Sequence, residues 1–274
     1  MTRPFLKMNG LGNDFVVIDA RKIPFSPTLD QVRAWGDRAR GIGFDQLIAI
    51  EASDSADAFM RVWNSDGSSV ETCGNALRCV GFVLSQDGGA EHSIDTLGGL
   101  TKTRTLSHND ISVDMGTPKL DWLSIPLSEE MNTAKLELEV GPLGAPLYHT
   151  PSAVNMGNPH CVFFVADMAK VDVASVGSLI ENHPLFPQGV NVEFVEVIDD
   201  QTLKMRVWER GAGITKACGT GACATLVAAA RRGLCGRSAT VHMDGGPLHI
   251  EWRDDDHVIM TGPASLDYQG VLPQ

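Results

Sequence analysis

Two cysteines that are each followed by glycine have the clearest potential for chemistry in this sequence. Cys73-Gly74 and Cys218-Gly219 are 145 residues apart, and each pair follows a polar loop and precedes a predicted helix. The first N–H groups of a helix have no partner within the helix, and with the helix dipole they favour negative charge. A thiol at such a position is expected to have a lowered pKa, so that the thiolate is accessible near neutral pH.

Two such thiols can invert a carbon centre between them. If one thiolate removes an α-proton and the other thiol donates a proton to the opposite face, the configuration is reversed. The N–H groups beside Gly74 and Gly219 can bind a carboxylate and stabilise the charge that develops on it. This predicts an amino-acid racemase or epimerase that needs neither pyridoxal phosphate nor metal. A Cys–His nucleophilic enzyme with His160 as base is an alternative, but it leaves the second cysteine unexplained.

The chain resembles itself when it is shifted by 145 residues. Polar and sulfur-bearing positions coincide without gaps: Gly12-Asn13 with Gly157-Asn158, Gln46 with Asn191, Arg61-Val62-Trp63 with Arg206-Val207-Trp208, Asn64 with Glu209, and Cys73-Gly74 with Cys218-Gly219. This period is much longer than that of solenoid repeats. We interpret it as two copies of one domain that face each other across a shared polar cleft.

The elements that must position these residues are strands and two buried helices. Helices are predicted from Gly74 to about Ser85 and from Thr220 to Arg232, and the second is nearly apolar on all sides, as expected for a helix enclosed by a sheet. Alternating or apolar runs predict strands at 15–19, 47–50, 59–63, 111–115, 136–140, 162–165, 192–197, 203–208, 239–243, 248–252 and 258–260. The linker between the halves is predicted near Thr117-Pro118.

Composition excludes several classes of protein. The 274 residues carry a net charge of −12, which argues against nucleic acid and anionic membranes as partners. No secretory pattern or membrane-spanning stretch is found, so a soluble, cytoplasmic protein is expected. In that compartment the six cysteines should be reduced, and their spacing does not predict a metal site. The four outside the motifs are expected to be small core residues: Cys79, Cys161, Cys223 and Cys235.

Several blocks of the sequence, in order, closely resemble the diaminopimelate epimerase family: 8–15, 41–47, 64–68, 73–75, 156–161, 209–213 and 217–221. The resemblance implies an α+β fold of two similar domains related by pseudo-two-fold symmetry, each a curved mixed β-sheet wrapped around a central helix. The domains would be residues 1–117, completed by a C-terminal strand at about 263–274, and residues 118–262. It also implies a cofactor-independent homodimer that interconverts LL-2,6-diaminopimelate and meso-diaminopimelate in lysine and peptidoglycan precursor biosynthesis.

The resemblance also implies roles for individual residues. Cys73 and Cys218 would be the acid/base pair, and His160 and Glu209 would assist at the reacting centre. The substrate would be bound by Asn13, Gln46, Asn64, Gly74, Asn75, Asn158, Asn191, Glu209, Arg210, Gly219 and Thr220. The first motif departs from many members, because Thr72 precedes the cysteine and Ala76-Leu77 follows Asn75. We expect this to alter helix packing without loss of activity.

Three other functions fit parts of the pattern. A proline or hydroxyproline racemase would share the fold and the cysteine pair, but that family typically has His where Asn75 stands. Phenazine-type isomerases lack the cysteine pair. A non-catalytic two-lobed amino-acid-binding protein would need the cleft but not two cysteines, and its usual exported setting would call for a signal peptide.

Overall fold

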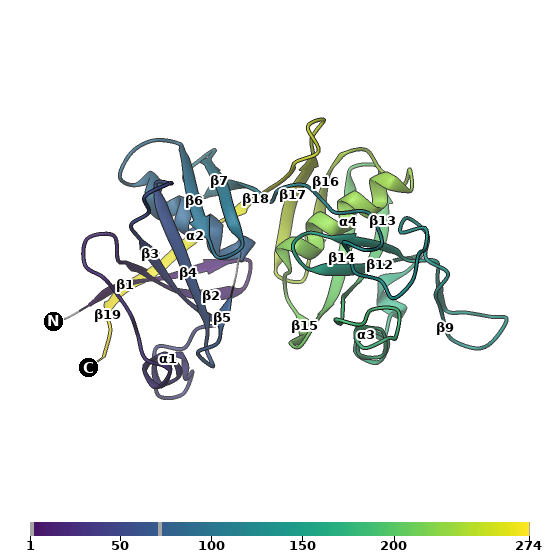
Figure 1. Cartoon of the computed structure of the whole chain (residues 1–274), viewed down its shortest axis with the longest axis horizontal. Helices are drawn as coiled ribbons and strands as arrows, with labels where there is room; N and C mark the ends of the chain where they lie inside the picture. The colour runs from purple at the N-terminus through teal and green to yellow at the C-terminus, as the bar shows by residue number, and fades with distance from the viewer. Residues whose placement is uncertain (1–2, 71–72, 274) are drawn as a thin grey trace. The chain divides into compact units, whose positions relative to one another are not determined.

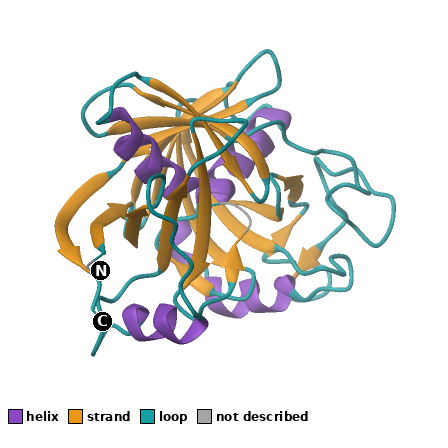
Figure 2. Ribbon diagram, turned by 60° about the vertical axis from the view of Figure 1, so that its left-hand side comes forward, coloured by secondary structure: helices purple, strands orange, loops and turns teal. Residues whose placement is uncertain are grey.

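The computed structural model describes residues 3–70 and 73–273 and divides into two compact units. The first comprises residues up to Asp114 together with those from Thr261 onward, and the second runs from Met115 to Met260. The division falls close to the predicted linker at Thr117-Pro118, whereas the departure at Thr72 lies outside the described residues. Strands make up most of the regular structure (Figures 1 and 2).

The first unit is a mixed sheet with one helix enclosed by it. Its elements are β1 (Pro4–Gly10), β2 (Asn13–Asp19), α1 (Leu29–Gly36), β3 (Gln46–Glu51), β4 (Ala58–Asn64), β5 (Ser69–Val70), α2 (Gly74–Ser85), β6 (Glu91–Thr96), β7 (Gly99–Thr105), β8 (Asp110–Asp114) and β19 (Ser265–Val271). Strand β1 pairs with both β2 and the C-terminal β19, so the end of the chain returns to this unit (Figure 1). Helix α2 packs against β1, β6, β7 and β8 and is buried from Gly74 to Leu84.

The second unit repeats this plan. Its elements are β9 (Glu139–Val140), β10 (Tyr148–His149), β11 (Ser152–Asn155), β12 (Pro159–Val165), the 3₁₀ turn η1 (Met168–Lys170), α3 (Val173–Glu181), β13 (Asn191–Asp199), β14 (Thr202–Glu209), β15 (Gly213–Thr215), α4 (Gly219–Arg231), β16 (Ser238–Met243), β17 (Gly246–Trp252) and β18 (Val258–Pro263), whose end crosses into the first unit. Helix α4, which begins one residue earlier than predicted, packs against β11, β12, β16 and β17.

The order and register of the strands establish the repeat. In each unit, successive strands pair antiparallel, parallel and antiparallel, as β1-β2-β3-β4 and as β11-β12-β13-β14. Phe15 lies opposite Gln46 in the first unit, and His160 lies opposite Asn191 in the second, with the same shift of 145 residues. The expected α+β fold of two similar units, each a mixed sheet with a central helix, is therefore confirmed.

Some sequence-based expectations differ from the structure. The run 136–140 is predicted as a strand, but only Glu139–Val140 is one, because Leu136 and Leu138 fill the core from an irregular segment. Cys235 is partly exposed and not a core residue, whereas Cys79, Cys161 and Cys223 are buried. Strands β1, β5, β6, β7, β10, β11, β15 and β19 and helices α1 and α3 are not predicted. The buried residues of α3 do repeat with a helical period, at Val173, Val176, Gly177 and Ile180, so the sequence analysis overlooked this helix. Among the described residues, no helix is both long and apolar enough to cross a membrane.

Candidate active site

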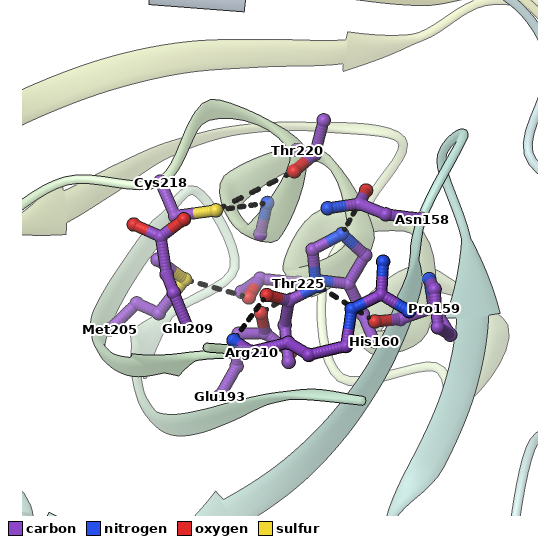
Figure 3. A network of polar contacts seen from close by, with 12 residues as sticks. Asn158, Pro159, His160, Glu193, Met205, Glu209, Arg210, Cys218, Thr220 and Thr225 are labelled. Atoms are coloured by element: carbon purple, nitrogen blue, oxygen red, sulfur yellow. Dashed lines mark hydrogen bonds and ion pairs between the residues drawn. The ribbon is translucent and has the colours of Figure 1, made fainter. Parts of the chain in front are cut away.

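The thiol of Cys218 lies at the start of α4. Cys218 has extended backbone angles (φ −130°, ψ 111°) and caps the helix, since its Sγ accepts a hydrogen bond from the N–H of Gly221 at 3.4 Å. The hydroxyl of Thr220 lies 3.5 Å from the same sulfur. Figure 3 shows these contacts next to Glu209, among other polar contacts of the second unit. The polar loop between β14 and α4 thus delivers the cysteine to a helix N-terminus, as the sequence predicts.

The electrostatic surroundings of Cys218 differ from the expectation. Burial raises the pKa of this thiol well above its usual value, the carboxylates of Glu209 and Glu193 raise it further, and the contacts with Thr220 and Gly221 lower it only in part. The expected lowering of the pKa is therefore wrong for Cys218, because desolvation outweighs the helix N-terminus. In this environment Cys218 is a thiol, which is the form needed by a proton donor.

Glu209 ends β14 beside this thiol. Burial raises the pKa of its carboxyl group, although hydrogen bonds with Thr215 and Cys218 and the charge on His160 oppose the change. The Thr215 hydroxyl donates to Glu209 Oε1. A carboxyl group with a raised pKa, in hydrogen-bonding contact with a thiol, is placed to exchange a proton with it.

His160 on β12 and Glu193 on β13 form a buried pair, and the partly buried Asn158 directly precedes β12. His160 Nδ1 lies 2.6 Å from Glu193 Oε1, and His160 Nε2 lies 2.8 Å from Asn158 Oδ1. His160 and Glu193 are fully buried. Glu193 is not among the residues predicted for the site; β13 also carries Glu196 and Asp199, so its sequence does not single out Glu193.

Of the remaining predicted residues of the second unit, Gly219 is the first residue of α4, and Asn191 and Arg210 bond to the backbone around the site. Asn191 donates from Nδ2 to the carbonyl of Pro159 (2.9 Å) and accepts from the N–H of Arg210 (2.9 Å). The Arg210 guanidinium donates to the carbonyl of Gln188 (2.8 Å) and is exposed. Asn191 therefore fixes the loop that carries Arg210.

Cys73 occupies the equivalent position in the first unit, at the start of α2. Its backbone angles (φ −142°, ψ 111°) match those of Cys218, but its side chain is less buried. Asn75 Nδ2 donates to Asn13 Oδ1 at 2.6 Å, and Asn75 Oδ1 accepts from Arg78 Nη1 at 3.0 Å. Arg78 is fully buried and also donates from Nε to the carbonyl of Pro263 (3.1 Å). Sequence analysis missed Arg78, whose charge would ordinarily place it on the surface.

Gln46 and Asn64 complete the polar set of the first unit. Gln46 Nε2 donates to Asn64 Oδ1 (3.1 Å), and Asn64 Nδ2 donates to the Ser68 hydroxyl (3.0 Å). Gln46 begins β3 and Asn64 ends the antiparallel β4, so both lie at one edge of the sheet. Asn191 and Glu209 lie at the same edge of the second sheet, at the start of β13 and the end of β14.

Each unit thus has a cysteine at a helix N-terminus and amide side chains at one sheet edge, and the second unit adds carboxyl and imidazole groups suited to proton transfer. In the part of the chain that the structure describes, no group of three or more His, Cys, Asp or Glu side chains is placed to hold a metal ion.

Solved structures of low sequence identity share this fold. A PhzF-family phenazine biosynthesis protein from Bacillus anthracis is 14% identical over the full length of both chains, with a TM-score of 0.69. A hydroxyproline epimerase from Agrobacterium vitis, solved with bound trans-4-hydroxy-L-proline, is 15% identical over 99% of this chain and 92% of that one, with a TM-score of 0.68.

Sequence relatives are much more similar. The proteins named diaminopimelate epimerase from Phenylobacterium zucineum and Caulobacter vibrioides are 55% and 52% identical to this chain, covering all of it and 99% of each relative. The sequence profile of the family described as diaminopimelate epimerase matches residues 5–120 and 152–266. The chain therefore belongs to the diaminopimelate epimerase family of isomerases.

Proposed function

We propose that this chain is a two-base epimerase that interconverts LL-2,6-diaminopimelate and meso-diaminopimelate, in the formation of lysine and peptidoglycan precursors. The observation that carries the proposal is the repeated one: each unit begins its buried helix with a cysteine, Cys73 on α2 and Cys218 on α4, in the same backbone conformation. The substrate is proposed from the relatives at 55% and 52% identity, which are named diaminopimelate epimerase.

The reaction needs one proton to leave and one to arrive. In one direction Cys73, as thiolate, takes the α-proton, and Cys218, as thiol, donates a proton to the opposite face of the carbanion. In the reverse direction the roles exchange, and Glu209, in hydrogen-bonding contact with Cys218, accepts the proton that activates the Cys218 thiol. His160 assists at the reacting centre.

The helix N-termini would hold the reacting carboxylate. The N–H groups at Gly74-Asn75 and Gly219-Thr220 belong to the first turns of α2 and α4, where such groups lack partners within the helix. They would also stabilise the negative charge that moves onto the carboxylate when the α-proton leaves.

The rest of the substrate is a second amino-acid group, which calls for amide and charged partners. We assign its recognition, together with positioning of the first group, to Asn13, Gln46, Asn64, Asn158, Asn191 and Arg210. Arg210 is the cation suited to the distal carboxylate. A racemase of proline or hydroxyproline is the second candidate, since a hydroxyproline epimerase shares the fold. It is disfavoured because position 75 holds an amide, bonded to Asn13 and Arg78, and not an imidazole.

The deciding experiment is proton NMR of LL-diaminopimelate with the reduced enzyme in D₂O. We expect the α-proton signal to disappear while the meso isomer accumulates. L-proline and trans-4-hydroxy-L-proline, incubated in parallel, should keep their α-protons. Exchange in these two and not in diaminopimelate would reassign the substrate, and no exchange in any of the three would favour the binding-protein alternative.

The protein is also proposed to be a cytoplasmic homodimer that uses neither metal nor organic cofactor. Sedimentation velocity should give a species of about twice the chain mass of 29.4 kDa. Treatment with EDTA should leave epimerisation unchanged, because thiols and amides supply the chemistry. A loss of activity that added divalent metal restores would contradict the proposal.

A further inference from the structure

The buried pair of His160 and Glu193 has no counterpart in the other unit. A shift of 145 residues places Phe15 and Ile48, both buried and apolar, at the corresponding positions. The second unit has therefore replaced two core residues by a titratable pair directly behind Cys218 and Glu209. Since burying such groups is costly, the pair requires an explanation beyond packing.

Both nitrogens of the His160 ring face hydrogen-bond acceptors. Nδ1 contacts a carboxylate oxygen of Glu193 at 2.6 Å, and Nε2 contacts the amide oxygen of Asn158 at 2.8 Å (Figure 3). An imidazole ring can donate from both nitrogens only when it carries the extra proton. With Glu193 as a carboxylate, a ring that donates from both nitrogens satisfies both contacts.

The charges around His160 and Glu193 also favour a protonated ring. Glu193 Oε2 is buried and has no hydrogen-bond partner among the residues that the structure describes. The titratable groups that interact with the pair are Glu209 from β14, Cys218 at the start of α4 and Cys161 from β12, and none of them can supply a positive charge. A buried carboxylate in such a setting needs a cation, and His160 is the group in contact with it.

We propose that Glu193 is a positioning residue for epimerisation: it holds His160 as an imidazolium ion, with Nδ1–H toward β13 and Nε2–H toward Asn158, beside Cys218. The inference rests on the proposed function for what that charge does. The cation offsets Glu209, and it favours the negative charge that develops on the reacting carboxylate when the α-proton leaves. It also fixes Asn158 with its amide oxygen toward the ring, which turns the amide nitrogen toward Cys218 and Thr220 in Figure 3.

The Glu193→Gln variant separates this role from packing. The amide introduced by this substitution can donate to Nδ1, which leaves a neutral ring with its proton at Nε2, still bonded to Asn158. Substrate binding should then change little, while the positive charge is lost. We expect kcat to fall by about 100-fold and KM to change by less than about threefold. The matched control is Glu196→Gln, three residues along the same strand, whose carboxylate accepts from the N–H of Met168 (2.9 Å) and should leave both constants within about twofold.

The protonation itself is measured by ¹⁵N NMR of the histidine rings at pH 7.5 in enzyme without substrate. The His160 signals are assigned by their absence from a His160→Asn variant. We expect both ring nitrogens to carry protons in the wild type and in Glu196→Gln, and only one to do so in Glu193→Gln. In the double variant, Glu193→Gln should cost no further activity beyond His160→Asn, because Glu193 acts through the ring.

A neutral His160 ring in the wild type would overturn the inference, and this result requires no variant to fold. A doubly protonated ring in Glu193→Gln, an unchanged kcat, or additive losses in the double variant would do the same. Failure of the proposed function is distinguishable, since an enzyme that does not epimerise diaminopimelate would still show the state of its ring.

Discussion

The two cysteine-bearing helix starts share a backbone but not a charge environment. Cys218 lies among Glu209, Glu193 and His160. A shift of 145 residues turns these three into Asn64, Ile48 and Phe15, all uncharged. The first unit instead buries a cation within its helix, Arg78, where the second has Cys223. The two units therefore share the backbone that places a cysteine at a helix N-terminus, but they differ in the charged groups around that thiol.

This difference matters for inversion at a carbon atom. A symmetric pair of thiols would rest in the same protonation state, whereas the reaction needs one base and one acid at each turnover. The carboxylates around Cys218 raise the pKa of its thiol, which suits the role of proton donor that we propose for it. Variants at equivalent positions of the two units test this difference.

Removal of either thiol should have the largest effect. Cys73→Ala and Cys218→Ala should each lower the rate of conversion of LL- to meso-diaminopimelate by at least about 10⁴-fold, because in the proposed mechanism each variant removes the proton carrier from one face of the α-carbon. Coupled assays or NMR would measure the rate, with the partly exposed Cys235→Ala as a control that stays within about twofold. If one single variant retained a few per cent of activity, the two helix starts would not be equivalent partners in the reaction.

The buried Arg78 should matter more for stability than its counterpart. Arg78→Met leaves the acceptors Asn75 Oδ1 and Pro263 O without their charged donor, and we expect a loss of about 3 kcal/mol in the free energy of unfolding of the first unit. Cys223→Ala, at the equivalent position of α4, should cost about 1–2 kcal/mol by leaving a small cavity.

Hydrogen exchange with mass spectrometry distinguishes the two, since it reports peptides of each unit separately. Arg78→Met should accelerate exchange throughout α2 and leave α4 unchanged, and Cys223→Ala the reverse. Equal losses would mean that Arg78 acts only by filling space.

These contrasts also mark what the sequence can and cannot reveal. The Cys-Gly motifs, each after a strand and a polar loop, predict the starts of α2 and α4 closely, because short-range order determines a helix N-terminus. The shift of 145 residues predicts the pairing of Gln46 and Asn191 with equivalent neighbours. Both features are local or repeated, so they can be predicted from the sequence alone.

Features that depend on burial could not be predicted from the sequence. A glutamate in a strand ordinarily marks the solvent face, so Glu193 gave no sign of its fully buried position. The raised pKa of Cys218 results from desolvation by side chains distant in sequence. Strand β7 was missed because its sequence, GLTKTRT, has one large apolar residue, and it forms only because β6 and β8 pair with it on either side.

The carboxylate beside Cys218 should govern the reactivity of that thiol. Because Glu209 raises the pKa of Cys218, Glu209→Gln should lower it, and the rate of alkylation by iodoacetamide at pH 8 should rise about tenfold. The change is measured by mass spectrometry of the peptide that carries Cys218, with the Cys235 peptide as an internal standard. The equivalent exchange in the other unit, Asn64→Asp, should slow alkylation of Cys73. An unchanged rate at Cys218 would show that burial alone controls the thiol.

The smallest expected effects come from the N-caps of α1 and α3, which support the two sheets by different chemistry. The Thr28 hydroxyl accepts from the N–H of Gln31, and Gln31 Oε1 accepts from the N–H of Thr28. Thr28→Ala should therefore cost about 1 kcal/mol of unfolding free energy at any pH.

Asp172 caps α3 as a carboxylate, and hydrogen bonds from Ser175 hold its pKa below the usual value. A depressed folded-state pKa adds stability above the unfolded-state value of about 4 and loses it as the pH falls through the folded-state value. Asp172→Ala should accordingly destabilise the second unit at pH 7, and this difference from the wild type should shrink as the pH falls below about 4. The Thr28→Ala difference should persist, and hydrogen exchange measures both. If the loss of stability in the two variants depended on pH in the same way, the charge on Asp172 would not explain how the α3 cap differs from the α1 cap.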